Sequence, residues 1–256
     1  MSRGNITGSV GVASVNGGNV RGMTRPLRIT LIAVIVALLA FVGGPWIYIN
    51  VFRDDAPAPL VDTTVPADTA VDTTVADTVP TAITDVSGTW TIGADSVVGY
   101  RVEEILFGQN VTAVGRTSAV TGSLTFENDS LTAASFEVDM ATIESDDSRR
   151  DRQFAGRIMD VATYPTATFT LDAPIALPAG ALDGAPVTID ATGSLTLRGT
   201  TKTVTIPLTA TLTPSGIDVR GEYEVVFADW QIPDPSLPGI STEDRGILEF
   251  ALIAVR

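Results

Sequence analysis

The chain has no cysteine and no histidine among its 256 residues. Disulfides, zinc–thiolate sites and cysteine nucleophiles are therefore excluded, as are imidazole metal ligands and Ser-His-Asp or Cys-His catalysis. Acidic residues are plentiful, but they show neither a paired-carboxylate spacing nor a metal-ligand cluster. We therefore expect a protein that is not an enzyme and that carries no metal or other cofactor.

Basic residues are scarce over most of the chain. The totals are 16 Lys+Arg and 30 Asp+Glu, a net charge of −14. Residues 1–52 hold four arginines and no acid, so the rest holds 12 basic and 30 acidic residues, a balance of −18. An acidic surface repels phosphate backbones, so we expect no nucleic-acid partner.

Charge is absent from the 24 residues between Arg28 and Arg53. As a helix this stretch would span roughly 36 Å, enough to cross a hydrocarbon core about 30 Å thick. The arginines on its N-terminal side indicate that the N-terminus lies on the cytoplasmic side of the membrane. We predict a disordered cytoplasmic tail (1–27), a single transmembrane helix in the cell membrane (28–52) and an extracytoplasmic remainder. A cleaved signal peptide is the alternative, disfavoured because the apolar run continues through residue 49.

Residues 53–86 change to Thr, Val, Asp, Ala and Pro, with a ten-residue near-repeat starting at Val61 and Val71. This composition offers little to bury and carries repelling aspartates. It predicts a stalk that acts as a spacer. Glycosylation of its threonines is left open.

Residues 87–256 alternate with period two, which is typical of half-buried strands. Val98, Tyr100 and Val102, for example, alternate with polar residues and glycine. Only residues 147–156 break this pattern, and they predict a short helix. About eight to ten strands with one inserted helix fit a barrel or a sandwich. In the strand around Leu195, we predict that Leu195 and Leu197 point inward, with Thr196 and Arg198 outward.

Several motifs of this domain resemble the YceI family of lipocalin-like, polyisoprenoid-binding proteins. The most specific are Arg150-Asp151, followed by Tyr164-Pro-Thr-Ala-Thr-Phe169, and the block Gly193-Ser-Leu-Thr-Leu-Arg-Gly-Thr-Thr-Lys-Thr-Val204. The opening strands are similar at Trp90–Ile92, Gly99–Val102 and Val114–Thr117. Family members commonly carry a histidine before the first long strand, where this chain has Asp95-Ser96. The resemblance implies an all-β, antiparallel, lipocalin-like barrel of about eight strands around a long apolar cavity.

The leading functional hypothesis is a membrane-tethered protein that holds a long apolar lipid, either a polyisoprenoid or an isoprenoid-quinone-like molecule. Its partners would be this lipid and the bilayer. The candidate lining residues are Tyr100, Val102, Phe126, Phe136, Phe169, Leu195, Leu197, Ile206, Leu208, Tyr223, Phe250 and Leu252. A possible head-group rim consists of Arg149, Arg150, Arg152 and Arg157.

Each of these assignments has an alternative. The apolar rows also fit a filled core, which would make the domain a ligand-free scaffold or interaction module. The rim arginines also fit ion pairs with neighbouring acids, namely Asp146, Asp147, Asp151 and Asp160.

Overall fold

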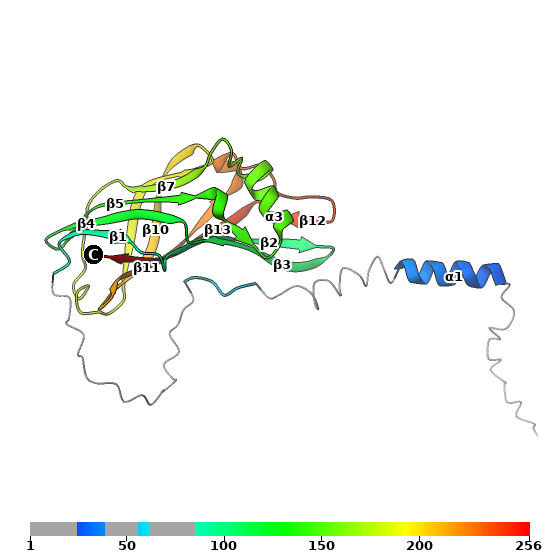
Figure 1. Cartoon of the computed structure of the whole chain (residues 1–256), viewed down its shortest axis with the longest axis horizontal. Helices are drawn as coiled ribbons and strands as arrows, with labels where there is room; N and C mark the ends of the chain where they lie inside the picture. Colours follow the sequence, from blue (N-terminus) through cyan, green and yellow to red (C-terminus); the bar gives the residue numbers. More distant parts are fainter. Residues whose placement is uncertain (1–24, 39–55, 62–84) are drawn as a thin grey trace, which may run out of the picture. The chain divides into compact units, whose positions relative to one another are not determined.

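A computed structural model describes residues 25–38, 56–61 and 85–256 (Figure 1). Its first element is helix α1, Arg25–Leu38, which begins inside the predicted tail and ends inside the predicted membrane segment. No helix in these described ranges is both long and apolar enough to cross a membrane. Residues 39–52 of the predicted span, and residues 1–24 of the tail, lie outside the described residues.

The predicted β-domain is an antiparallel barrel. Eight strands follow one another in the order β1-β4-β5-β7-β9-β10-β11-β13, and the ring closes because β1 pairs with both β4 and β13. Their bounds are β1 Gly88–Ile92, β4 Val120–Glu127, β5 Ser130–Asp139, β7 Thr166–Leu171, β9 Val187–Leu197, β10 Thr200–Thr213, β11 Gly216–Val226 and β13 Arg245–Val255. The eight-stranded antiparallel barrel predicted from the sequence is thereby confirmed.

Further strands extend this ring. Strand β2 pairs with β13 beyond the short β1, and it continues the sheet through β3 to β6. The small strands β12 and β8 pair with β2 and β5. The bounds are β2 Val97–Leu106, β3 Gln109–Thr117, β6 Glu144–Ser145, β8 Ile175–Ala176 and β12 Ile240–Thr242.

The inserted helix lies at the same end of the barrel as β12 (Figure 1). Helix α3, Ser148–Gln153, begins where Asp147 Oδ1 accepts the N–H of Arg149 at 2.7 Å, and it continues as a π-helical turn, η5 Phe154–Ile158. Asp151 Oδ1 accepts the N–H and the hydroxyl of Ser145 at 2.9 and 2.6 Å. The helix predicted over 147–156 is thus present and is fixed to β6. Two short 3₁₀ turns complete the domain, η4 Met140–Thr142 and η6 Phe227–Trp230.

The predicted parity of β9 is correct. Leu195 and Leu197 are each 4% exposed, whereas the Thr196 hydroxyl lies 2.9 Å from that of Thr201 on the outer face. Arg198 and Gly199 form the turn into β10 with φ angles of 47° and 72°, as a tight hairpin with right-handed strand twist requires. The inward face of the barrel is therefore apolar along this strand.

Part of the predicted spacer does not behave as a spacer. Residues 56–61 belong to the same compact unit as the barrel, residues 54–256, and hydrogen-bond to its outer wall. The composition of this segment did not predict these contacts. Its partners are arginines and a glutamate on strands far away in the sequence, and composition does not show which residues the fold brings together. Residues 62–84 of the stalk lie outside the described residues.

Candidate functional site

The barrel interior is not filled. A cavity of about 150 Å³, here called the apolar chamber, lies among strands β4, β5, β7, β9, β10, β11 and β13. Its lining includes Phe126, Phe136 and Phe169, and Thr168 is the only polar residue among the described residues that line it. A dry cavity of this size with such a lining accepts an apolar molecule the size of benzene without rearrangement.

A second cavity of about 130 Å³, the mixed chamber, lies at the end of the barrel that carries the helix. Its wall is also mainly apolar, but it includes four polar residues: Tyr100, Glu104, Arg150 and Thr242. Within the described residues, the Thr242 hydroxyl is buried without a hydrogen-bond partner. A chamber of this kind offers a few polar contacts inside an apolar shell, as binding sites for small molecules commonly do.

The two chambers adjoin one another. Val98, Val138, Ala167 and Leu248 line both of them. Side chains at this junction therefore separate one chamber from the other. A slim ligand that spans both chambers would place its apolar part in the first and its polar end in the second.

Two of the polar residues of the mixed chamber, Arg150 and Glu104, contact one another. Arg150 pairs with Asp146, its Nη2 lies 3.7 Å from Glu104 Oε2, and 17% of its side chain is exposed. Burial by itself would lower the pKa of Arg150, but the carboxylates of Asp146 and Glu104 outweigh it and raise that pKa. Burial raises the pKa of the Tyr100 hydroxyl well above its ordinary value, although Arg150 opposes the shift. The chamber thus presents the ion pair of Arg150 and Glu104 beside a neutral phenol.

Tyr100 is fixed by packing on both faces of its ring. One face stacks on Phe154 of the π-helical turn, with ring centroids 5.0 Å apart and planes 12° apart. The other covers Gly115 of β3, where an added Cβ would lie 2.4 Å from the Tyr100 ring. Glycine at this position lets the aromatic ring lie flat against the wall.

The family-like block around Tyr164 is structural in this chain. The Tyr164 ring covers Gly199, whose added Cβ would lie 2.4 Å from it, and Arg198 sits 5.8 Å from the ring centroid. Arg198 also donates to the carbonyl of Gln231. The two blocks singled out in the sequence therefore meet at the β9–β10 turn and hold it, and they also supply Phe169, Leu195 and Leu197 to the chamber walls.

The structure places eleven of the twelve predicted lining residues on a chamber wall. Tyr100, Val102 and Leu197 line the mixed chamber, and the apolar chamber is lined by Phe126, Phe136, Phe169, Leu195, Ile206, Leu208, Phe250 and Leu252. Tyr223 lines neither and instead packs, half-buried, against the core. Whether these residues contact a ligand remains a prediction.

Of the four predicted rim arginines, the structure brings only Arg150 to a chamber. Arg157 is exposed and donates to the carbonyls of Asp234 and Pro235, both at 2.7 Å. Arg149 and Arg152 are exposed on α3. Successive helical residues point in different directions, so Arg150 alone of the four lines a chamber. A contact of the other three with a head group stays a prediction. The ion-pair alternative holds for Arg150 and Asp146.

Sequence reasoning missed Glu104, Phe154, Met159 and Thr242 in the mixed chamber. Glu104 continues the inward parity of Tyr100 and Val102 along β2, so the alternation itself could have indicated it. The helical residues and Thr242 carried no such signal, because only the tertiary fold brings their segments over the barrel end. Among the described residues, no group of three or more acidic side chains could hold a metal ion.

Comparisons with known proteins agree with this architecture. The profile of the YceI-like domain matches residues 90–254. A polyisoprenoid binding domain from Saccharophagus degradans is 15% identical over 66% of this chain and 98% of its own, with a TM-score of 0.53. BcnA from Burkholderia cenocepacia is 23% identical, covering 61% of this chain and 96% of its own, with a TM-score of 0.48. A search of curated proteins gives no match.

At these identities the structural likeness concerns the fold alone. The family profile, however, covers well over half of the chain and nearly all of the barrel, from β1 to β13. The position where relatives commonly carry histidine is occupied here by Asp95 and by Ser96, whose hydroxyl accepts the N–H of Ile253 at 2.9 Å. The barrel, its helix and the matched blocks together show that the chain belongs to the YceI-like family.

Proposed function

We propose that this protein holds a long apolar lipid, a polyisoprenoid or an isoprenoid-quinone-like molecule, inside its barrel. The observation that carries the proposal is the pair of adjoining chambers, one apolar and the other with polar groups at its end. The relative described as a polyisoprenoid binding domain has the same fold, which supports the class of ligand. The lipid tail would occupy the apolar chamber, which must widen for a chain larger than a benzene-sized group, with its polar end near Arg150 and Tyr100.

The rival function, a ligand-free scaffold with a filled core, is disfavoured by the unfilled interior. Large inward side chains such as Phe136, Phe169 and Phe250 border an empty cavity. A scaffold gains nothing from such space, because unfilled apolar volume lowers stability.

We also propose that the protein is tethered to the cell membrane by residues 28–52, with the barrel on the outer side. The uncharged stretch and the arginines before it support this arrangement. Burying one CH₂ from water gains about 0.8 kcal/mol, so a lipid released into water would be lost very slowly. Measured from a bilayer, that gain is close to zero, so a barrel tethered beside the membrane exchanges its lipid readily.

The lipid proposal is tested by native mass spectrometry of the full chain, purified from membranes and freed of detergent. We expect a stoichiometric lipid adduct in the wild type. Ala167→Phe, at the junction of the chambers, should abolish it, whereas Thr170→Phe on the exposed face of the same strand should not. Circular dichroism checks that both variants are folded. A wild type that is consistently empty would favour the scaffold.

The tether is tested by adding protease to intact cells. We expect cleavage between residues 61 and 85, which a denaturing gel shows as a barrel fragment separated from the N-terminal part of the chain. A barrel that stays intact until the membrane is permeabilised would mean that the proposed orientation is wrong.

A further inference from the structure

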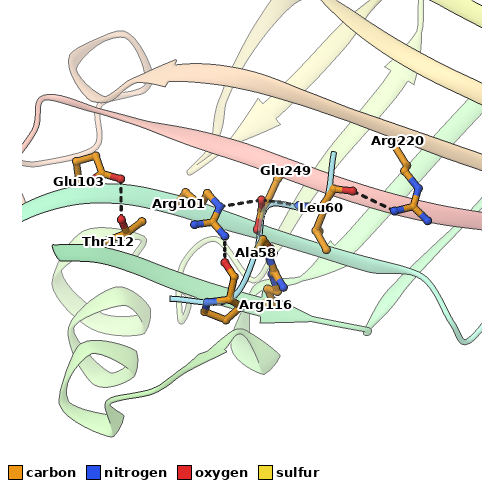
Figure 2. Close-up of polar contacts among 9 residues, drawn as sticks. Ala58, Leu60, Arg101, Glu103, Thr112, Arg116, Arg220 and Glu249 are labelled. Atoms are coloured by element: carbon orange, nitrogen blue, oxygen red, sulfur yellow. Dashed lines mark hydrogen bonds and ion pairs between the residues drawn. The ribbon is translucent and has the colours of Figure 1, made fainter. Parts of the chain in front are cut away.

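Four charged side chains on the outer wall of the barrel converge on residues 57–60 (Figure 2). Arg101 on β2 donates to the carbonyl of Pro57, and Arg116 on β3 donates to that of Ala58. Arg220 on β11 donates to the carbonyl of Leu60 at 3.1 Å. In return, the N–H of Leu60 donates to Glu249 Oε2 on β13 at 3.1 Å.

The arginines are oriented before they meet this segment. Glu249 accepts from Arg101 Nε at 3.2 Å and from Arg116 Nε and Nη2 at 3.0 and 2.8 Å. Asp218 holds Arg220 through two bonds of 2.9 Å each. A guanidinium fixed on a carboxylate through some of its five N–H groups still presents others in a fixed direction. The wall therefore offers preorganised donors.

The hydrogen bonds are made to the main chain of the segment and not to its side chains. Three carbonyls accept and one N–H donates, while Pro57 and Pro59 have no N–H to leave unsatisfied. Alternating prolines favour an extended chain with exposed carbonyls, which needs little ordering before it binds. Glu249 is 0% exposed although it lies on the outer face of the barrel. The bound segment and the arginines therefore exclude solvent from it, as a bound ligand does in a binding site.

We propose that Arg101, Arg116, Arg220 and Glu249 form a binding site for an extended, proline-containing peptide, occupied by the chain's own residues 57–60. This strap, as we call residues 57–60, fixes the N-terminal part of the chain to the barrel wall well before β1 begins at Gly88. The 25 residues 61–85 then lie between two fixed points, because Val86 is already buried in the core.

One consequence rests on the proposed membrane tether. With the strap bound, only residues 53–56 separate the predicted span from the barrel, a reach of at most about 14 Å. With the strap released, a free chain of the 34 residues 53–86 would have an end-to-end distance of roughly 32 Å. The strap thus changes the length of free chain between the predicted span and the barrel.

The proposal is tested by amide hydrogen exchange of the full chain in detergent micelles. The Leu60 amide should exchange at least about tenfold more slowly than in a synthetic peptide of residues 55–62, since its hydrogen bond to Glu249 must open first. Arg220→Gln should raise its exchange severalfold. Arg245→Gln is the matched control, because it also removes a wall guanidinium, and that guanidinium bonds to Asp244 and Glu224.

Amides of β9 and β10 report in the same experiment that the barrel is folded. If Arg220→Gln unfolds it, Arg220→Lys replaces that variant, since lysine keeps the charge but lacks the guanidinium fork. A wild-type Leu60 amide that exchanges as fast as the peptide overturns the proposal, and so does an equal effect of the control. Neither result depends on lipid or bilayer, so a failure here is distinguishable from a failure of the proposed function.

Discussion

On strand β13, residues that face the barrel interior are more exposed than a charged residue that faces outward. The three consecutive residues Leu248, Glu249 and Phe250 show this difference. Leu248 and Phe250 point inward yet remain partly accessible, because they line the unfilled chambers. Glu249 points outward yet is 0% exposed, because two arginines and the strap cover it. In this barrel, the direction in which a side chain points therefore does not by itself determine how buried it is. Apolar residues face a space left open for a ligand, and a charged residue is enclosed by its partners.

The largest expected effect concerns the inner face of β9. Leu197→Asp should lower the free energy of unfolding by several kcal/mol, since it places a carboxylate at a position that is only 4% exposed. Thr196→Asp, on the outer face of the same strand, should stay within about 0.5 kcal/mol of the wild type. Denaturant midpoints measure both. Comparable midpoints for the two variants would mean that the inner and outer faces of β9 do not differ in burial.

The next effect concerns the outer face. Glu249→Ala removes the acceptor shared by Arg101, Arg116 and the strap, and should cost about 2 kcal/mol, less than a fully buried pair because both arginines are partly exposed. Glu222→Ala, at the exposed residue directly opposite on β11, should change stability by less than about 0.5 kcal/mol. Thermal unfolding checks this, at about 2–4 °C per kcal/mol for a domain of this size. Equal shifts would show that enclosure of Glu249 contributes nothing.

A smaller effect tests the packing of the mixed chamber. Gly115→Ala places a Cβ 2.4 Å from the Tyr100 ring, so the ring must move into the chamber, at a cost of about 1–3 kcal/mol. Gly156→Ala, in the π-helical turn, has open space around its added Cβ and serves as the control. Melting temperatures of the two variants, with the yield of the lipid adduct, give the comparison. An unchanged Gly115→Ala variant would show that Tyr100 is loosely held.

The smallest effect is a pH dependence. Burial raises the folded-state pKa of Tyr100 above the ordinary phenol value near 10. The stability that depends on the protonated phenol is therefore fully present below pH 10, and is lost as the pH rises through the folded-state pKa. Above pH 10 the wild type should lose stability more steeply than Tyr100→Phe in chemical unfolding. Parallel curves would place the Tyr100 hydroxyl in contact with water.

The alternation of apolar residues predicted the inner wall well because a strand has only two faces. Along β2 the inward row of Val98, Tyr100 and Val102 is readable from sequence, and so, in retrospect, is Glu104. Tyr223 obeys the same alternation but misses both chambers, because parity states which face a residue takes and not how far along the barrel an empty space extends. Only Arg150 of the four predicted rim arginines lines a chamber for a related reason, since four cations close in sequence need not share one side of a helix.

The amino-acid sequence by itself determined the antiparallel barrel, the parity of its strands, the inserted helix and the family. Period-two patterning, turn residues and local caps act between neighbours in the chain and therefore leave their mark in it. Only the tertiary structure decided that two chambers remain open, that Arg150 alone reaches the cavity, and that residues 57–60 bind the wall. These features depend on contacts between β2, β3, β11, β13 and segments far away in sequence, for which no local pattern exists.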